Sequence, residues 1–123
     1  MQGESLSWLM DIETLREICL KLPAVTEDIK WEHDLCFSVG SRMFCVASLD
    51  PPFSCSFKVK PAEFDEMSVR EGCKPAPYMA RAQWVLVTDA ARMSKKEWER
   101  HIQESYEMIK AKLTKKLRTE LGI

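Results

Sequence analysis

Apolar residues recur along this chain with two different periods, and the changes of period mark its secondary structure. Between Asp11 and Leu22 they lie mostly three or four positions apart, which is the spacing of one face of a helix. Asp11 stands where a side chain caps a helix N-terminus, and Pro23 stands where a helix must end. The pattern predicts a first helix over this segment.

A second and longer helical pattern occupies the C-terminal end of the chain. Ser94, followed three residues later by Glu97, forms a capping box, in which each side chain satisfies a free backbone N–H at the helix start. Apolar residues then step along one face until Gly122: Trp98, Ile102, Tyr106, Ile109, Leu113 and Leu117. We predict one helix from Ser94 to Gly122.

The middle of the chain changes to short β-rich runs bounded by residues that favour turns. A hairpin is expected at Gly40, and Asp50-Pro51-Pro52 makes a second turn. Pro61 opens a short helix that carries Phe64 and Met67 three residues apart. The predicted strands are residues 26–31, 35–39, 43–49, 53–59 and 84–87.

The order of these elements is α-β-β-β-β-α-β-α. Antiparallel strands flanked by helices, without repeated βαβ units, predict an α+β fold with a single antiparallel sheet and helices packed on one face. A length of 123 residues favours one domain, because chains divide only beyond roughly 250 residues. We expect residues 10–123 to form it. Residues 1–9 lack a clear period and are expected to be an N-terminal extension.

Composition narrows the class of protein. The chain is 46% hydrophobic and 30% charged, which is typical of a folded domain rather than a disordered segment. No apolar run approaches the roughly 18 residues of a bilayer-spanning helix, and the first residues lack the layout of a signal peptide. We expect a cytoplasmic protein without a membrane partner, and we favour a monomer.

The cysteines and histidines indicate no metal site. Five cysteines, an odd number without a C-x-x-C pair, predict free, buried or half-buried thiols in a reducing compartment. His33 and Cys36 have a spacing found in zinc sites, but no second pair exists, so a zinc finger is not expected. Both His33, in a polar turn, and His101, off the apolar face of its helix, are expected to be exposed.

The parts of an active site are hard to assemble from this sequence. Four glycines, at positions 3, 40, 72 and 122, are too scattered for a phosphate-binding loop. A nucleophilic Ser or Cys needs a base and an orienting group, and two histidines in charged, surface-like settings do not supply them. We therefore predict a protein that is not an enzyme and has no cofactor.

The formal net charge of -1 conceals an uneven distribution. Residues 1–41 hold three basic and eight acidic residues. Residues 42–81 hold six basic and five acidic residues, and residues 82–123 hold nine basic and six acidic residues. The first third is acidic and the remainder mildly basic. A domain that coats nucleic acid along its whole surface is excluded, since such domains have a pI above about 9 and this chain has a pI near 6.1.

Basic residues in the middle of the chain fall at predicted turns and strand ends, where they can reach DNA phosphates. Lysines at such positions have a second explanation, because charged edge strands resist aggregation. Aromatic residues can likewise stack on nucleobases or pack in the core. The aromatic candidates are Trp31, Phe44, Tyr78 and Trp84.

Several short patterns follow one another in order between Asp11 and Leu117. They are Trp31, Phe37-Ser38-Val39-Gly40-Ser41-Arg42-Met43-Phe44, Phe57-Lys58-Val59-Lys60-Pro61, Pro75-Ala76-Pro77-Tyr78-Met79, Trp84-Val85 and Ser105-Tyr106. With this order and spacing the chain resembles the MmcQ/YjbR family of small bacterial proteins. The resemblance implies a frataxin-like (CyaY-like) fold and DNA binding through a double-wing surface, a role inferred for the family largely from its fold.

The resemblance also places individual residues. Arg42 matches a basic position after the hairpin glycine, Lys58 a lysine before the Pro-opened helix, and Tyr78 and Trp84 the aromatic positions around the last strand. Together with the other basic turn positions, the predicted DNA-contacting residues are Arg42, Lys58, Lys60, Lys74, Tyr78 and Arg81. A continuous positive strip through them would favour DNA as a partner, with the acidic first third pointing away.

The alternative is a frataxin-like metal- or protein-binding module that uses the acidic N-terminal third. Hard cations prefer carboxylate oxygen ligands, and this segment is rich in them. Arg16 and Lys21 interrupt the set, which ranks this function second. Its candidate residues are Asp11, Glu13, Glu17, Glu27 and Asp28.

Overall fold

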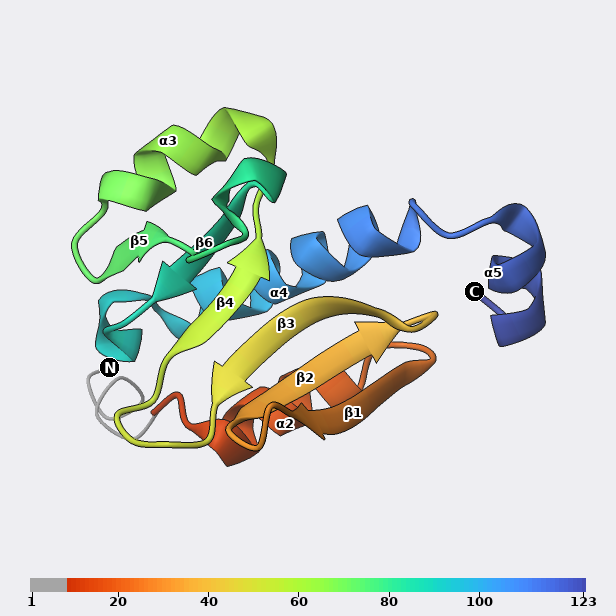
Figure 1. The fold of residues 1–123 in the computed structure, drawn as a ribbon, viewed down its shortest axis with the longest axis horizontal. Helices are drawn as coiled ribbons and strands as arrows, with labels where there is room; N and C mark the ends of the chain where they lie inside the picture. Colours follow the sequence, from red (N-terminus) through yellow and green to blue (C-terminus); the bar gives the residue numbers. More distant parts are fainter. Residues whose placement is uncertain (1–8) are drawn as a thin grey trace.

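The strands of the protein form one six-stranded sheet (Figure 1). The computed structural model describes residues 9–123, so the predicted extension lies outside the described residues except for Leu9. Neighbouring strands are antiparallel throughout, in the order β1-β2-β3-β4-β6-β5. The strands are β1 (Val25–Lys30), β2 (Asp34–Val39), β3 (Arg42–Ser48), β4 (Cys55–Lys58), β5 (Cys73–Pro75) and β6 (Trp84–Val87).

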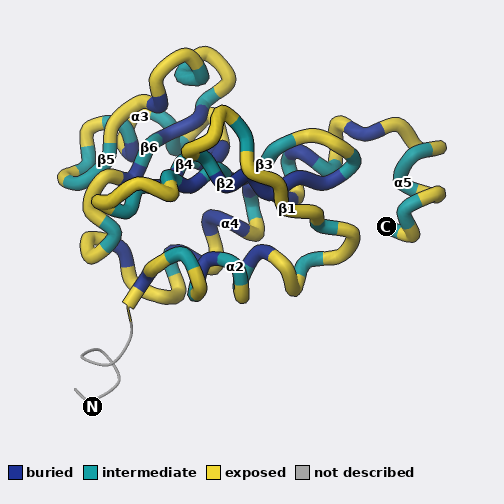
Figure 2. The backbone as a smooth tube through the Cα atoms, turned by 60° about the horizontal axis from the view of Figure 1, so that its bottom comes forward, coloured by how far each residue is buried: buried dark blue, intermediate teal, exposed yellow. Residues whose placement is uncertain are grey.

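The helices gather on one side of this sheet. They are α2 (Ile12–Leu20), α3 (Pro61–Val69), α4 (Lys95–Lys110) and α5 (Lys115–Leu121). Figure 2 shows α2 and α4 together beneath the strands, and ion pairs join α3 to α4. The predicted α+β fold with helices packed on one face is confirmed. Over residues 9–123, no helix is both long and apolar enough to cross a membrane.

The core lies between the sheet and α4. Trp98 of α4 is fully buried and packs edge-on against Phe53 and Phe57, with ring centroids 6.3 and 5.8 Å apart. Two turns further along the same face, Tyr106 packs edge-on against Phe44 at 5.4 Å. The apolar stripe predicted for the C-terminal helix is therefore the surface that seals the sheet.

All five cysteines are free thiols, as predicted, and four of them are buried. Cys45 Sγ and Cys55 Sγ lie 3.4 Å apart in the core between β3 and β4. Burial raises the pKa of the Cys36 thiol to about 11, so it stays protonated at neutral pH. These buried side chains act as small apolar core residues.

The hairpin between β2 and β3 turns at Gly40, as predicted. Gly40 has φ +58°, and a Cβ at this position would lie 2.7 Å from Leu113. Leu113 and Leu117 cover the turn from the C-terminal end of the chain, so a side chain would meet both positive-φ strain and a collision. The glycine lets the hairpin tip sit directly under α5.

A seam runs between β3 and β4 where their hydrogen-bond ladder stops. A bulge opposite Phe37 leaves Phe44 without a partner on β2. The buried hydroxyl of Ser105 on α4 bridges the seam: it donates to the Phe44 carbonyl at 2.6 Å and accepts from the Lys58 N–H at 3.0 Å. One helix side chain thus replaces the missing strand-to-strand bond.

Three features differ from the sequence expectations. The single C-terminal helix was a wrong prediction, because α4 ends at Lys110 and α5 begins afresh after Thr114, whose side chain accepts the Leu117 N–H at 3.1 Å. The three-residue β5 was not predicted, since it is too short to show a period. His101 is 1% exposed, not exposed as predicted, because α3 covers that side of α4 and the ring stacks on Phe57.

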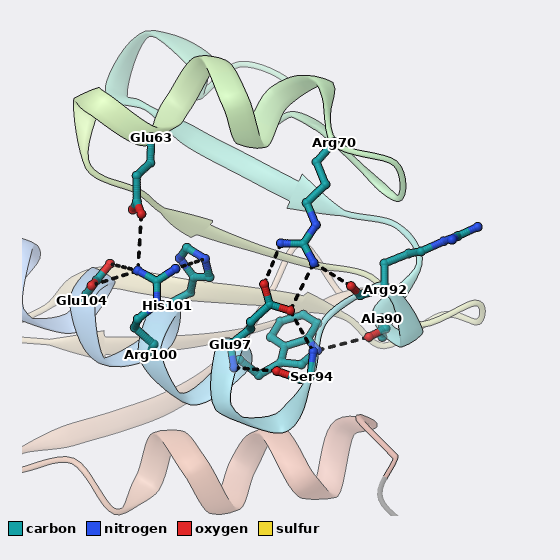
Figure 3. A network of polar contacts seen from close by, with 10 residues as sticks. Glu63, Arg70, Ala90, Arg92, Ser94, Glu97, Arg100, His101 and Glu104 are labelled. Atoms are coloured by element: carbon teal, nitrogen blue, oxygen red, sulfur yellow. Dashed lines mark hydrogen bonds and ion pairs between the residues drawn. The ribbon is translucent and has the colours of Figure 1, made fainter. Parts of the chain in front are cut away.

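We expect the attachment of α3 to α4 to weaken in acid. Arg70 holds Glu97 through two bonds of 2.8 and 3.1 Å and lowers the pKa of that carboxyl from 4.5 to about 2 (Figure 3). A depressed pKa stabilises the fold above pH 4.5, and this contribution is lost as the pH falls through about 2. Thermal unfolding of the wild type and Glu97→Gln should therefore differ at neutral pH and converge near pH 2. Gln keeps the capping box with Ser94, so a pH-independent difference would contradict this assignment.

Candidate nucleic-acid interface

The face of the sheet opposite the helices carries a largely apolar hollow. Side chains alternate between faces along a strand, so residues that are out of phase with the core point away from α4. Val46 of β3, Ser56 of β4 and Leu86 of β6 form the floor of this hollow, which has a volume of about 630 Å³. It lies across the same seam that Ser105 bridges from the other side.

Two exposed aromatic side chains border the hollow. Trp31, in the turn between β1 and β2, is 65% exposed, and Tyr78, in the loop between β5 and β6, is fully exposed. Both have positive φ, 53° and 66°, which non-glycine residues adopt at a conformational cost. Strained backbone that presents large apolar rings to solvent beside a cavity is typical of a binding site.

The hollow also contains a small set of polar groups. Asp34, at the start of β2, lines it together with Ser48, Ser54 and Ser56. The Ser48 hydroxyl is already hydrogen-bonded to the backbone of Asp50. A carboxylate and hydroxyl oxygens can accept hydrogen bonds from amino and imino groups of a ligand. The site therefore combines an apolar floor, aromatic walls and hydrogen-bond acceptors.

Three of the predicted DNA-contacting residues lie at the β5–β6 end of this face. Tyr78 borders the hollow directly. Lys74 is exposed and pairs in register with Leu86 of the floor, so both residues share the open face. Arg81 is exposed in the short 3-10 helix Ala80–Ala82 of the Tyr78 loop.

The other three predicted residues lie elsewhere or are engaged. Lys58 is only 8% exposed, its ammonium donates to the Ala82 carbonyl, and burial, followed by the nearby Lys112, lowers its pKa. Lys60 pairs with Glu104 of α4 at 3.4 Å. Arg42 is exposed but pairs in register with the core residue Val39, which directs it toward the helix side of the sheet. The six residues therefore do not form one positive strip.

The aromatic candidates also divide. Phe44 and Trp84 are buried, which agrees with the packing alternative for aromatics on strands. Trp31 and Tyr78 are exposed and remain available to a ligand. The two exposed aromatic residues lie in loops and have positive φ, a backbone property that hydrophobic periodicity does not reveal.

Over residues 9–41, the acidic side chains do not converge on a cation site. Arg16 pairs with Glu27 at 2.7 Å and with Glu13 at 3.3 Å, while Asp28 pairs with Lys30 at 3.7 Å. Asp11 accepts the Thr14 N–H as the cap of α2. In the part of the chain that the structure describes, metal-binding groups converge instead at Glu63, His101 and Glu104, which the sequence did not single out.

Comparison with known proteins identifies the family and the fold of the chain. The family model for YjbR matches residues 20–108. The crystal structure of the Deinococcus radiodurans protein DR2400, a DUF419 domain, shares 26% identity and a TM-score of 0.81 over 91% of this chain and 88% of that one. A Pseudomonas syringae protein of known structure shares 16% identity and a TM-score of 0.68, over 81% of this chain and 99% of that one. This similarity supports the fold alone. No curated protein matches the chain. The match over most of the chain, together with the fold, shows that it belongs to the YjbR family.

Proposed function

We propose that this protein binds DNA on the open face of its sheet, by stacking unpaired bases on Trp31 and Tyr78. The observation that carries the proposal is the pair of exposed, strained aromatic residues on either side of one hollow. Aromatic side chains hold single-stranded nucleic acid because every base presents a π-face, and each stacked base contributes about 1–3 kcal/mol.

The charges around the hollow favour stacking over phosphate contacts as the main source of affinity. Lys74 and Arg81 are the predicted cations beside it that have no ion pair within residues 9–123, and Asp34 places a negative charge inside. Two phosphate contacts to a single strand give a slope of log K against log salt concentration of about -1.4. We therefore expect a shallow salt dependence. Binding proceeds without a chemical reaction.

The hollow favours DNA whose bases are not paired in a duplex. A duplex hides the faces of its bases, so Trp31 and Tyr78 can stack only on bases that have left the helix or on a single strand. Asp34 and the serine hydroxyls then face base edges, where they accept hydrogen bonds. We expect single-stranded DNA to bind more tightly than a duplex of the same sequence.

Replacing either aromatic residue should weaken binding to a single-stranded oligonucleotide. We expect Trp31→Ala and Tyr78→Ala each to cost about 1–3 kcal/mol of binding free energy, the value of one stacked base. Trp31→Ala removes one of the four tryptophans of the chain, so binding is followed on a dye-labelled oligonucleotide and not by tryptophan fluorescence. The measurement is a fluorescence-anisotropy titration of the labelled oligonucleotide with each variant, with thermal melts to verify the fold.

Val69→Ala provides a matched control. Val69 is 83% exposed at the end of α3, so this variant also removes an exposed apolar side chain, but away from the hollow. It should leave the affinity unchanged. Equal affinities of the wild type, Trp31→Ala and Tyr78→Ala, or the same loss in Val69→Ala, would remove the support for this site.

A further inference from the structure

The geometry points to a divalent-metal site formed by Glu63, His101 and Glu104, in which a transition-metal ion such as Zn²⁺ takes the place of the Arg100 guanidinium. The site lies between α3 and α4, on the helix side of the sheet. It is separate from the open face that we propose for DNA, so it neither depends on that function nor explains it.

The three side chains already surround one cation. Nη1 of Arg100 donates to Glu63 Oε2 at 3.3 Å and to Glu104 Oε2 at 3.2 Å, and its Nη2 contacts His101 Nε2 at 3.3 Å. Figure 3 shows the two carboxylates and the imidazole converging on this guanidinium from two helices. One ligand atom from each residue lies within 4.8 Å of the others. The oxygen and nitrogen lone pairs of the three side chains therefore point toward the positively charged guanidinium of Arg100.

The guanidinium fits this position poorly. Charge-assisted N–H···O bonds have lengths of about 2.7–2.9 Å, and the bonds of Arg100 to Glu63 and Glu104 are longer. Oε1 of Glu63 and Nδ1 of His101 are buried without a hydrogen-bond partner. The His101 side chain is only 1% exposed, so solvent does not satisfy its nitrogen. Buried polar groups in this state cost stability unless something else satisfies them.

Arg100 can leave without disturbing the fold. Its side chain is 47% exposed, so it can swing into solvent. A hollow of about 380 Å³ between α3 and α4, bordered by Glu63, Glu66 and His101, leaves room for an ion and its water ligands. His101 cannot move in the same way, because its ring stacks on Phe57 at 5.4 Å. A fixed imidazole and two adjustable carboxylates are therefore left facing one another.

The donor set selects the class of ion. One imidazole nitrogen and two carboxylate oxygens suit zinc and its first-row neighbours, whereas calcium takes six to eight oxygens. Neutral imidazole is the form of histidine that binds a metal. Zinc bonds of about 2.0–2.2 Å require the ligand atoms to move closer than they stand now. The departure of Arg100 permits this.

Isothermal titration of the purified full chain with ZnCl₂, and with CoCl₂ followed by absorption, tests the site. We expect one ion per chain, no saturable heat with CaCl₂, and a cobalt spectrum without thiolate charge-transfer bands, which separates this site from the cysteines. Glu104→Gln and His101→Gln should weaken binding at least about tenfold, the low end of the loss when even an outer partner of a metal ligand is removed. Arg100→Gln should tighten binding, because it removes the cation that contacts all three ligands, although Lys60 remains 3.4 Å from Glu104.

The opposite effect of Arg100→Gln distinguishes a metal site from general damage. His101→Gln alters a buried ring and can unfold the protein, so Glu104→Gln, at a side chain that is 20% exposed, gives the second reading. His33→Gln serves as the control, because His33 pairs with Asp50 far along the chain and should not change the affinity. Absence of saturable zinc binding to both the wild type and Arg100→Gln, or affinities unchanged in Glu104→Gln, would overturn the proposal.

Discussion

Ser105→Ala should lower the free energy of unfolding by about 2–6 kcal/mol, because it leaves two buried backbone groups unsatisfied and each costs about 1–3 kcal/mol. The hydroxyl is the partner of both the Phe44 carbonyl and the Lys58 N–H, and it is fully buried. The β3–β4 ladder ends at the pair Cys45–Phe57, so Phe44 and Lys58 do not pair with each other in it. Denaturant unfolding followed by circular dichroism measures the loss.

Ser68→Ala is the matched control for this variant. The hydroxyl of Ser68, on α3, is buried without a hydrogen-bond partner. Its removal therefore deletes an unsatisfied group and should be neutral or slightly stabilising. If Ser105→Ala were as mild as Ser68→Ala, the seam between β3 and β4 would not depend on the hydroxyl.

Trp98→Ala should cost about 3–5 kcal/mol of unfolding free energy, the range for truncating a buried large aromatic side chain. Trp98 is fully buried, packs on Phe53 and Phe57, and donates its indole N–H to the Ala90 carbonyl at 3.2 Å. Domains of this size are stable by only about 5–15 kcal/mol, so the variant should unfold at much lower denaturant concentration. Chemical denaturation at 25 °C gives the value.

Trp98→Phe separates the packing contribution from the hydrogen bond. It keeps an aromatic ring between Phe53 and Phe57 but leaves the Ala90 carbonyl without its indole donor. We expect a smaller loss, about 1–3 kcal/mol for the lost indole hydrogen bond and the reduced volume. The Ala90 carbonyl still accepts the Met93 N–H at 3.4 Å. Equal losses in the Ala and Phe variants would mean that the hydrogen bond, rather than the packing, dominates.

Local chemistry made much of the fold predictable. The Ser94–Glu97 capping box starts α4 as expected, because both of its bonds form between residues three positions apart. The hairpin at Gly40 was predictable for the same local reason, because a single glycine with positive φ forms its turn. The break before α5 was missed because Thr114 sits among lysines, and the heptad-like apolar positions Leu113 and Leu117 continue across it.

The candidate sites were less predictable, because they depend on contacts between distant segments. Lys58 is predicted as a DNA contact from its place at a strand end, yet the loop that carries Ala82 folds over it. The sequence makes His101 look exposed, because only the later packing of α3 against α4 buries it. Tyr78 borders the hollow of the open face, in a turn where its backbone has positive φ, which hydrophobic periodicity does not reveal.

The two edge strands of the sheet, β1 and β5, carry features that oppose edge-to-edge association between copies of the protein. Strand β1 exposes charged residues along its length, and β5 has only three residues and ends in Pro75, which has no N–H to donate. A strand from another copy would therefore find charge at one edge and a missing donor at the other. We expect the protein to stay dispersed at high concentration instead of joining its sheets edge to edge into a fibre.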